Sequence, residues 1–259
     1  ISRLAGTQRI ERLGSTACRL AGAQQGSGIA EYCERAGLDF GFVPGMRKLT
    51  DMRLLAIDMD STLITIECID EVADLAGVKA EVSAITAAAM SGELDYAQSL
   101  RRRVALLRGL DQGALARVYH ERLRLSSGAE TLLAALRGAG VKTLLVSGGF
   151  SFFTDRLKAR LGLDYSISNT LEIEGGRLSG RVVGDIVDAE AKAAKLRALR
   201  DQLGIARAAI LAIGDGANDL AMMAEAGVSI AYRAKPVARS KADYALDHTG
   251  LDGVLNLFA

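Results

Sequence analysis

Four short apolar runs, each followed by polar or glycine-rich residues, constrain the fold more than any other feature of the chain. The runs cover residues 52–57, 141–146, 209–213 and 228–231. Runs of this length bounded by turn residues are typical of buried parallel strands, which are covered on both faces. Segments with helical periodicity separate them, at residues 129–139, 152–161 and 189–203. Strands that alternate with helices predict an α/β fold with a Rossmann-like parallel sheet and right-handed crossovers.

A long insertion separates the first two runs. About eighty residues lie between residues 57 and 141, far more than one crossover helix requires. Helical periodicity recurs there at residues 67–76, 79–90 and 95–107, and Glu130 begins the helix that returns to the sheet. We therefore expect a helical cap at about residues 66–127, inserted after the first core strand. A hairpin is expected at residues 171–183, around a turn at 174–177.

The first fifty residues carry less information. Helical patterns appear near residues 9–20 and 29–36, and residues 38–43 have the composition of a strand. We interpret residues 1–50 as an N-terminal extension, either purely structural or the remnant of a small regulatory-type domain. Residues 51–259 would form the core domain.

The composition argues against several classes of partner and site. The chain has 32 Lys and Arg against 31 Asp and Glu, and its net charge of +1 indicates neither a nucleic-acid nor a membrane partner. The three cysteines form no C-x-x-C pattern and the two histidines are isolated, which argues against a zinc site and a disulfide framework. No apolar run approaches the roughly 18–20 residues that span a bilayer, and no signal-peptide pattern opens the chain, so we expect a cytoplasmic protein. A homodimer is possible as well as a monomer, because dimers are common among soluble proteins.

Acidic residues follow two of the apolar runs. Asp58 and Asp60 end the first run, and residues two apart at the end of an extended strand point the same way. Two carboxylates brought together need a cation between them or a shared proton. Asp215, flanked by Gly214 and Gly216, ends the third run. The two strand ends could bind one hard cation, for which Mg²⁺ is suited, although each motif alone also occurs in ordinary turns and helix caps.

Groups that could hold an anion also follow the strands. Ser147, Gly148 and Gly149 end the second run before a helix, where a hydroxyl and free N–H groups can bind an anion or simply cap the helix. Lys192 and Lys195 both lie in the helical segment 189–203. A phosphoryl site with two carboxylates needs positive charge, but helical position alone does not choose between these lysines.

In this order, the motifs resemble those of the haloacid dehalogenase superfamily. They are Asp58-Met59-Asp60-Ser61-Thr62, Ser147-Gly148-Gly149, Lys192 and Gly214-Asp215-Gly216-Ala217-Asn218-Asp219. Within the superfamily the chain is similar to the phosphoserine phosphatase family, on Glu67 after the first motif and on the stretches 98–104 and 146–150. The resemblance covers roughly residues 50–259. It implies hydrolysis of O-phospho-L-serine to L-serine and phosphate, the last step of serine biosynthesis, through an aspartyl-phosphate.

The resemblance also implies roles for the acidic residues. Asp58 would be the nucleophile, and Asp60 the general acid toward the leaving serine oxygen and then the general base toward water. Mg²⁺ would be held by the side chains of Asp58 and Asp215 and by the backbone carbonyl of Asp60. Asp219 would contact the metal ligands rather than the metal itself and hold them in place.

The remaining roles concern the phosphate and the substrate. Ser147, the Gly148 N–H and Lys192 would hold the transferring phosphoryl group, and Lys192 matches the family lysine better than Lys195. Asn218 would contact the phosphate or the substrate.

In the cap, Glu67 would bind the ammonium of phosphoserine. Arg103 would bind its carboxylate, because a planar guanidinium can contact both oxygens. Met90 and Tyr96 are expected to form an apolar wall of the pocket.

Two other functions fit part of the pattern. A related phosphatase or phosphotransferase could act on another small phosphorylated amino acid, such as phosphothreonine or phosphohomoserine, with the same core residues. A receiver-type binding switch also places acids, a hydroxyl and a lysine at the ends of parallel strands. Asp60 and the inserted cap argue against the switch, since a general base two residues away hastens the loss of a phosphoryl group from Asp58.

Overall fold

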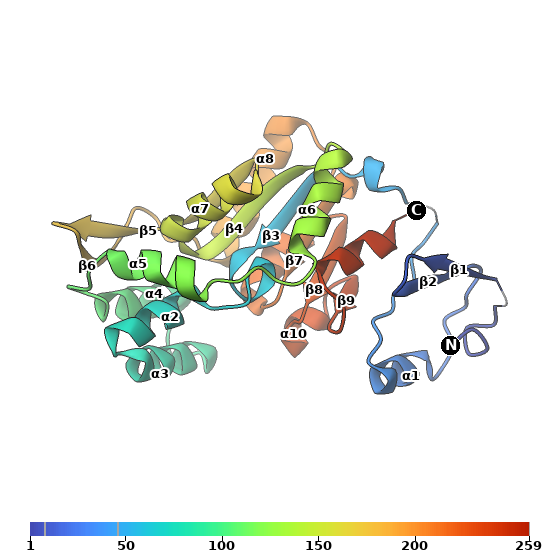
Figure 1. Cartoon of the computed structure of the whole chain (residues 1–259), viewed down its shortest axis with the longest axis horizontal. Coiled ribbons are helices and arrows are strands. Elements are labelled where there is room, and N and C mark those ends of the chain that lie inside the picture. The colour runs from blue at the N-terminus through green and yellow to red at the C-terminus, as the bar shows by residue number, and fades with distance from the viewer. Residues whose placement is uncertain (8, 46, 259) are drawn as a thin grey trace.

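The protein is described by a computed structural model that covers residues 1–7, 9–45 and 47–258. Its main sheet has seven strands in the order β6-β5-β4-β3-β7-β8-β9 (Figure 1). They are β3 (Leu54–Asp58), β4 (Lys142–Phe150), β5 (Tyr165–Glu174), β6 (Arg177–Val183), β7 (Ile210–Gly214), β8 (Val228–Tyr232) and β9 (Tyr244–Leu246). All neighbours are parallel except β5 and β6. The predicted α/β fold with its largely parallel sheet is confirmed.

Both faces of the sheet are covered by helices. On β3, Leu55 and Ile57 belong to one apolar cluster, which includes residues of α6 (Ala129–Gly138) and α7 (Ser151–Leu161). Leu54 and Ala56 belong to a second cluster, with residues of α8 (Ala189–Leu203) and α9 (Leu220–Ala224). Successive side chains of a strand point to opposite faces. Because both faces are buried, the strands read as continuous apolar runs rather than as alternating patterns.

The α-helices of the insertion after β3 lie near one end of the molecule (Figure 1). They are α2 (Cys68–Ala76), α3 (Lys79–Met90), α4 (Tyr96–Ala105) and α5 (Gly113–Arg117). The first three were expected, whereas the short α5 was not. The bounds of about 66–127 for a separate cap stay a prediction.

The expected hairpin at residues 171–183 is confirmed as β5 and β6. Its turn contains Gly175 and Gly176 at φ 57° and 78°, the left-handed conformation that a tight two-residue hairpin turn requires. That this hairpin extends the main sheet beyond β4 was not predicted. The hairpin also contacts the insertion: the Gly109 N–H donates a hydrogen bond to the Leu178 carbonyl at 2.8 Å.

Two expectations for the N-terminal segment are wrong. Residues 9–20 form an antiparallel hairpin, β1 (Ile10–Leu13) and β2 (Ala17–Leu20), rather than a helix. The physical reason lies at Gly14, whose φ of 68° interrupts the helical path and turns the chain. Residues 38–43 are not a strand, whereas the helix α1 (Ile29–Ala36) was predicted correctly.

The N-terminal segment packs against the C-terminal part of the chain through polar contacts. Asp39 accepts hydrogen bonds from the backbone amides of residues 247–249 and from the Thr249 hydroxyl. Arg19 donates to the Phe258 carbonyl at 2.6 Å. These bonds explain why residues 38–43 follow an irregular path: their partners are loop amides rather than a strand edge. The predicted division into residues 1–50 and 51–259 stays a prediction, and Gln8, Met46 and Ala259 lie outside the described residues.

No helix within the described ranges is long and apolar enough to cross a membrane. The short helix α10 (Pro236–Arg239) lies between β8 and β9 in the chain.

Candidate active site

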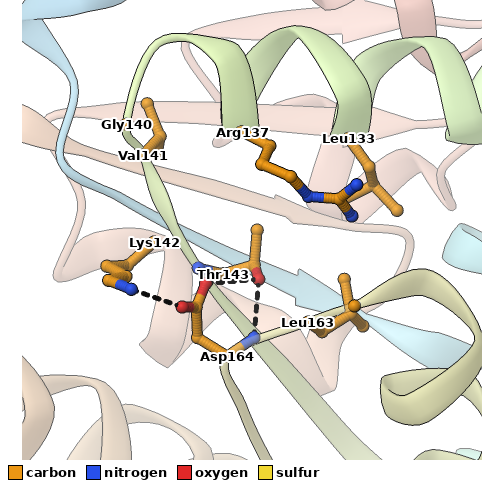
Figure 2. Close-up of a pocket in the computed structure, with 9 residues that line it drawn as sticks. Leu133, Arg137, Gly140, Val141, Lys142, Thr143, Leu163 and Asp164 are labelled. Atoms are coloured by element: carbon orange, nitrogen blue, oxygen red, sulfur yellow. Dashed lines mark hydrogen bonds and ion pairs between the residues drawn. The ribbon is translucent and has the colours of Figure 1, made fainter.

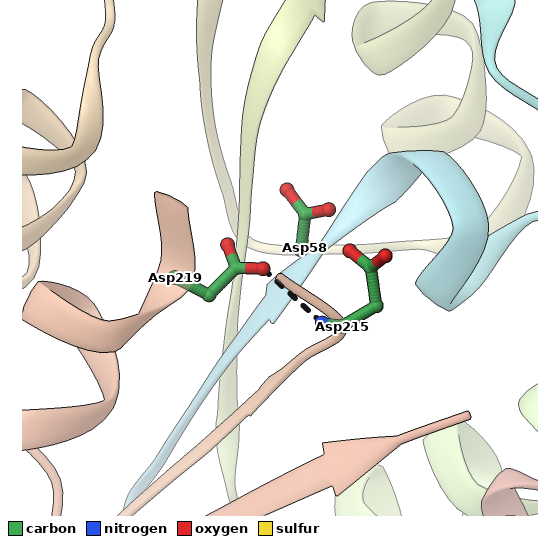
Figure 3. A group of neighbouring side chains, drawn as sticks. All are labelled: Asp58, Asp215 and Asp219. Atoms are coloured by element: carbon green, nitrogen blue, oxygen red, sulfur yellow. Dashed lines mark hydrogen bonds between the residues drawn. The ribbon is translucent and has the colours of Figure 1, made fainter. Parts of the chain in front are cut away.

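Three aspartates converge at the carboxyl ends of the central strands (Figure 3). Asp58 is the last residue of β3, and Asp215 directly follows the neighbouring parallel strand β7. Asp219 lies one turn further along the chain and its side chain is fully buried. Each contributes a carboxylate oxygen to a group whose members all lie within 4.8 Å of one another.

The cluster is electrostatically strained without a cation. Burial and the charge of Asp219 raise the pKa of Asp58 well above its usual range, and the same two causes raise the pKa of Asp215 to about 6. Like charges in a buried site favour protonation or a bound cation. All three donors are hard oxygens, the ligands that divalent cations such as Mg²⁺ and Ca²⁺ prefer. The residues present therefore fit a divalent metal.

Lys192 supplies the one buried positive charge described at this site. It projects from the first turn of α8 and is 1% exposed. Its Nζ donates to Asp58 Oδ1 at 2.5 Å and to Asp219 Oδ1 at 2.8 Å. Burial alone would lower the pKa of Lys192, but the two carboxylates outweigh this and raise it above its ordinary value. Lys195 is exposed, so burial separates the two lysines where helical position could not.

Asp219 also shapes the loop after β7. Its Oδ2 accepts hydrogen bonds from the N–H groups of Asp215 and Gly216 at 3.1 and 3.2 Å, the first of which is drawn in Figure 3. Because Lys192 occupies its other oxygen, the carboxylate of Asp219 is engaged on both sides. A Cβ on Gly214 would lie 2.5 Å from the Asp219 side chain, so this position needs glycine.

Asp60 lies beside this cluster, in the turn after β3. Its Oδ1 accepts the N–H of Cys68, the first residue of α2, at 2.8 Å, and its Oδ2 accepts the hydroxyl of Ser147 at 3.3 Å. The carboxylate therefore caps a helix, as the simpler interpretation of the motif required, and still faces the site. Burial and the nearby charge of Glu67 raise the pKa of Asp60 to about 7.

Ser147, Gly148 and Gly149 lie within β4, because the strand extends to Phe150 rather than ending at Val146 as expected. The pairing of β4 with β5 shifts register between these two residues. Ser147 is fully buried, and its Oγ accepts the Gly149 N–H at 2.8 Å. A Cβ on Gly148 would lie 2.2 Å from the Tyr96 Oη, so only glycine fits beneath this ring.

The two predicted residues of the cap differ in their surroundings. Glu67 is exposed at the start of α2, where its Oε1 accepts the Ser61 hydroxyl at 2.6 Å. Arg103 is half-buried on α4, whereas Arg101 and Arg102 are exposed. Within the described part of the chain, the buried Nε of Arg103 has no hydrogen-bond partner. A buried donor without a partner is costly, so this guanidinium is suited to an incoming anion.

A model of the haloacid dehalogenase-like hydrolases matches residues 55–224. The chain belongs to this family. A phosphoserine phosphatase of Polaromonas sp. is 56% identical over 215 residues, which cover 81% of this chain and 91% of the relative. The crystal structure of a probable phosphoserine phosphatase from Vibrio cholerae, in unliganded form, is 42% identical with a TM-score of 0.81, over 93% of this chain and 76% of that one. A phospho-aspartyl intermediate analogue of phosphoserine phosphatase is 38% identical with a TM-score of 0.75, over 80% of this chain and 99% of that one.

The family resemblance inferred from the motifs is thus confirmed, but sequence reasoning missed some neighbours of the site in this haloacid dehalogenase-like hydrolase. Tyr96 does more than line a wall: its O–H donates to the Gly148 carbonyl at 2.9 Å, and burial raises its pKa to about 12. Met90, expected beside it, is 73% exposed and that expectation is wrong. Lys235 was not predicted. Its N–H donates to the Asp215 carbonyl at 2.8 Å, and its charge opposes the rise in the pKa of Asp215.

A cavity of about 200 Å³ lies elsewhere, at the amino end of β4 (Figure 2). Its polar groups satisfy one another, since Asp164 accepts hydrogen bonds from Lys142 Nζ and from the backbone and hydroxyl of Thr143. Ligands of open α/β sheets bind at the carboxyl ends of the strands, the opposite end from this cavity. We assign it no part in the chemistry.

Proposed function

We propose that this hydrolase converts O-phospho-L-serine to L-serine and phosphate, the last step of serine biosynthesis. The observation that carries the proposal is the buried contact of 2.5 Å between Lys192 Nζ and the Oδ1 of Asp58, at the carboxyl end of a central parallel strand. The similarity to phosphoserine phosphatases over most of the chain supports the choice of substrate.

Asp58 is the proposed nucleophile. Its carboxylate oxygen forms a bond to phosphorus while the bond between phosphorus and the serine oxygen breaks, which leaves an aspartyl-phosphate. Lys192, 2.5 Å away, opposes the rise in the pKa of the attacking carboxylate and neutralises charge on the transferring group. A water then attacks the aspartyl-phosphate and releases inorganic phosphate.

Asp60 is the proposed acid and base. It gives a proton to the departing serine oxygen and later takes one from the attacking water. A pKa of about 7 supports both roles, because both protonation states are populated near neutral pH. The Cys68 N–H and the Ser147 hydroxyl fix the orientation of this carboxylate.

Mg²⁺ is the proposed metal, held by Asp58, Asp215 and the Asp60 carbonyl. When bound, it would offset the negative charge of the phosphoryl group and of the aspartates. Asp219 holds the Asp215 loop in place through two backbone amides.

The phosphoryl group is proposed to bind Ser147, the Gly148 N–H, Lys192 and Asn218. Ser147 and Gly148 lie next to Asp58, since β4 and β3 are parallel neighbours with Asp58 in register with Val146. In the cap, Glu67 would bind the ammonium of the substrate and Arg103 its carboxylate. The buried Nε of Arg103, which has no hydrogen-bond partner among the described residues, supports this assignment.

The test is phosphate release from L-phosphoserine with MgCl₂ and with EDTA, in the wild type, Asp58→Asn and the matched control Asp155→Asn. Asp155 is an exposed residue of α7. We expect turnover that requires the metal, disappears in Asp58→Asn and persists in the control. Turnover of phosphothreonine but not of phosphoserine would instead support a phosphatase that acts on another small phosphorylated amino acid. A folded protein without phosphatase activity on any monoester would refute the enzyme and favour the binding switch.

The cytoplasmic location and a homodimer stay predictions. Light scattering measures the mass of the purified protein and so distinguishes a homodimer from a monomer.

A further inference from the structure

Ser61 has a backbone conformation that serine rarely adopts. Its φ is 56° and its ψ is 2°, in the left-handed region. Arg233 is the one other non-glycine residue with positive φ in the described ranges. Glycine is the default residue at such positions, because a Cβ makes the conformation unfavourable. A serine here therefore needs a reason that lies in its side chain.

The backbone around Ser61 is set by its neighbours rather than by the hydroxyl. The Ser61 N–H donates to the Ile66 carbonyl at 3.2 Å, and the Ile64 N–H donates to the Met59 carbonyl at 3.0 Å. Asp60 on one side is tied to the start of α2 through Cys68. Glycine would complete the same loop with less strain.

Among the residues that the structure describes, the hydroxyl of Ser61 forms one hydrogen bond, and it is to Glu67. The Oγ donates to Glu67 Oε1 at 2.6 Å. Glu67 lies at the start of α2, and over the described residues no lysine, arginine or histidine forms an ion pair with it. Its neighbours in the site are acidic, since its charge raises the pKa of Asp60 and adds to the rise at Asp215. An exposed carboxylate that faces like charges would otherwise rotate toward solvent.

We propose that Ser61 is a positioning residue that holds Glu67 beside the active-site aspartates, with one carboxylate oxygen fixed and the other free for the ammonium of the substrate. The inference rests on the proposed function, which assigns the ammonium to Glu67. Serine rather than glycine occupies the left-handed position because the chain gives up some stability to fix this carboxylate. The preference for an amino-acid phosphate over a simple monoester thus begins in the turn that carries the nucleophile.

The test compares Ser61→Gly and Ser61→Ala with the wild type. Thermal unfolding is measured, and kcat and KM are measured for L-phosphoserine and for p-nitrophenyl phosphate, which has no ammonium. Ser91→Ala is the matched control, because Ser91 also donates to an exposed glutamate of the insertion, Glu93, at 2.9 Å.

We expect Ser61→Gly to raise the KM for phosphoserine about 10–20-fold, the lower range for a lost hydrogen bond to a charged group, with kcat little changed. Its Tm should rise by about 2–4 °C, because the left-handed strain is removed. Ser61→Ala should raise KM equally without the gain in Tm. Neither variant should change the KM for p-nitrophenyl phosphate, and Ser91→Ala should change neither substrate.

A double-mutant cycle with Glu67→Ala separates this role from a purely structural one. If Ser61 acts through Glu67, Ser61→Gly adds nothing to KM in the Glu67→Ala background. An unchanged KM for phosphoserine in Ser61→Gly overturns the proposal, and so does an equal rise with p-nitrophenyl phosphate or a full rise in the Glu67→Ala background. A wild type that does not hydrolyse phosphoserine, or a Glu67→Ala variant with unchanged KM, refutes the proposed substrate assignment and this inference with it.

Discussion

Replacement of Lys192 by methionine should both destabilise the protein and strongly reduce its activity. The side chains of Lys192, Asp58 and Asp219 are 1%, 4% and 0% exposed, so their ion pairs belong to the buried class. Breaking a buried pair by removing one partner typically costs about 3–5 kcal/mol, against about 0–1 kcal/mol for a surface pair. Methionine fills a similar volume, so the loss would be mainly electrostatic.

At about 2–4 °C per kcal/mol, this loss corresponds to a fall in Tm of roughly 6–20 °C. A divalent cation should restore part of it, because the cation replaces positive charge among the remaining carboxylates. Phosphatase activity should fall by about 10²–10³-fold even in excess metal, as expected when one group that stabilises the transition state is removed.

The assay is urea or thermal unfolding at pH 7 in EDTA and in MgCl₂, followed by phosphate release. Lys195→Met is the matched control on the same helix, and it should stay within about 0.5 kcal/mol of the wild type because this side chain is exposed. A Lys192→Met variant as stable as the wild type in EDTA would show that the carboxylates do not depend on this charge, and the electrostatic reasoning for the site would be wrong.

Three further perturbations follow from the structure. Asp39→Ala should lower stability by about 1–3 kcal/mol near pH 7. Partial burial raises the pKa of Asp39, but its hydrogen bonds to the amides of residues 247–249 and to the Thr249 hydroxyl lower it overall. The stabilisation is therefore present at neutral pH and is lost as pH falls through the lowered pKa. Equal stability of Asp39→Ala and wild type at pH 7 would contradict this. In EDTA, Asp60→Asn should be more stable than the wild type at pH 8 but not at pH 4. The pKa of Asp60 is raised to about 7, so the wild-type protein loses stability as pH rises from about 4 to about 7. A variant that is less stable than the wild type at pH 8 would rule this out. Gly148→Ala should reduce phosphatase activity because the new Cβ would lie 2.2 Å from the Tyr96 Oη, and adding Tyr96→Phe should recover part of it; an unaffected single variant would argue against this close approach.

The strands and the nucleophile were predictable because their causes are local. Four apolar runs ended where buried parallel strands end, and parallel neighbours bring Asp58 and Asp215 to the same edge without further information. The hairpin at residues 10–20 was missed because its strands are largely exposed and lack a strong period of two.

Neighbours of the site that come from distant elements were harder to find. Tyr96 meets Gly148 from 52 positions away, and Lys235 reaches the Asp215 loop through the turn before Pro236. Neither residue carries a pattern that spacing can detect, because the contact exists only after the elements pack. The choice of Lys192 over Lys195 came from the family resemblance, and the physical reason became visible only in the difference in their burial.

The contacts of Asp39 have a consequence for the order in which the chain acquires its structure. Its partners at residues 247–249 lie 208–210 positions further along the sequence, and the Phe258 carbonyl lies 239 positions from Arg19. Translation at about 5–20 residues per second needs roughly 10–40 s to cover such a separation. During that time the N-terminal segment lacks the C-terminal residues that bind Arg19 and Asp39 in the native structure. Arg19 and Asp39 therefore leave the ribosome well before the residues that complete their native contacts.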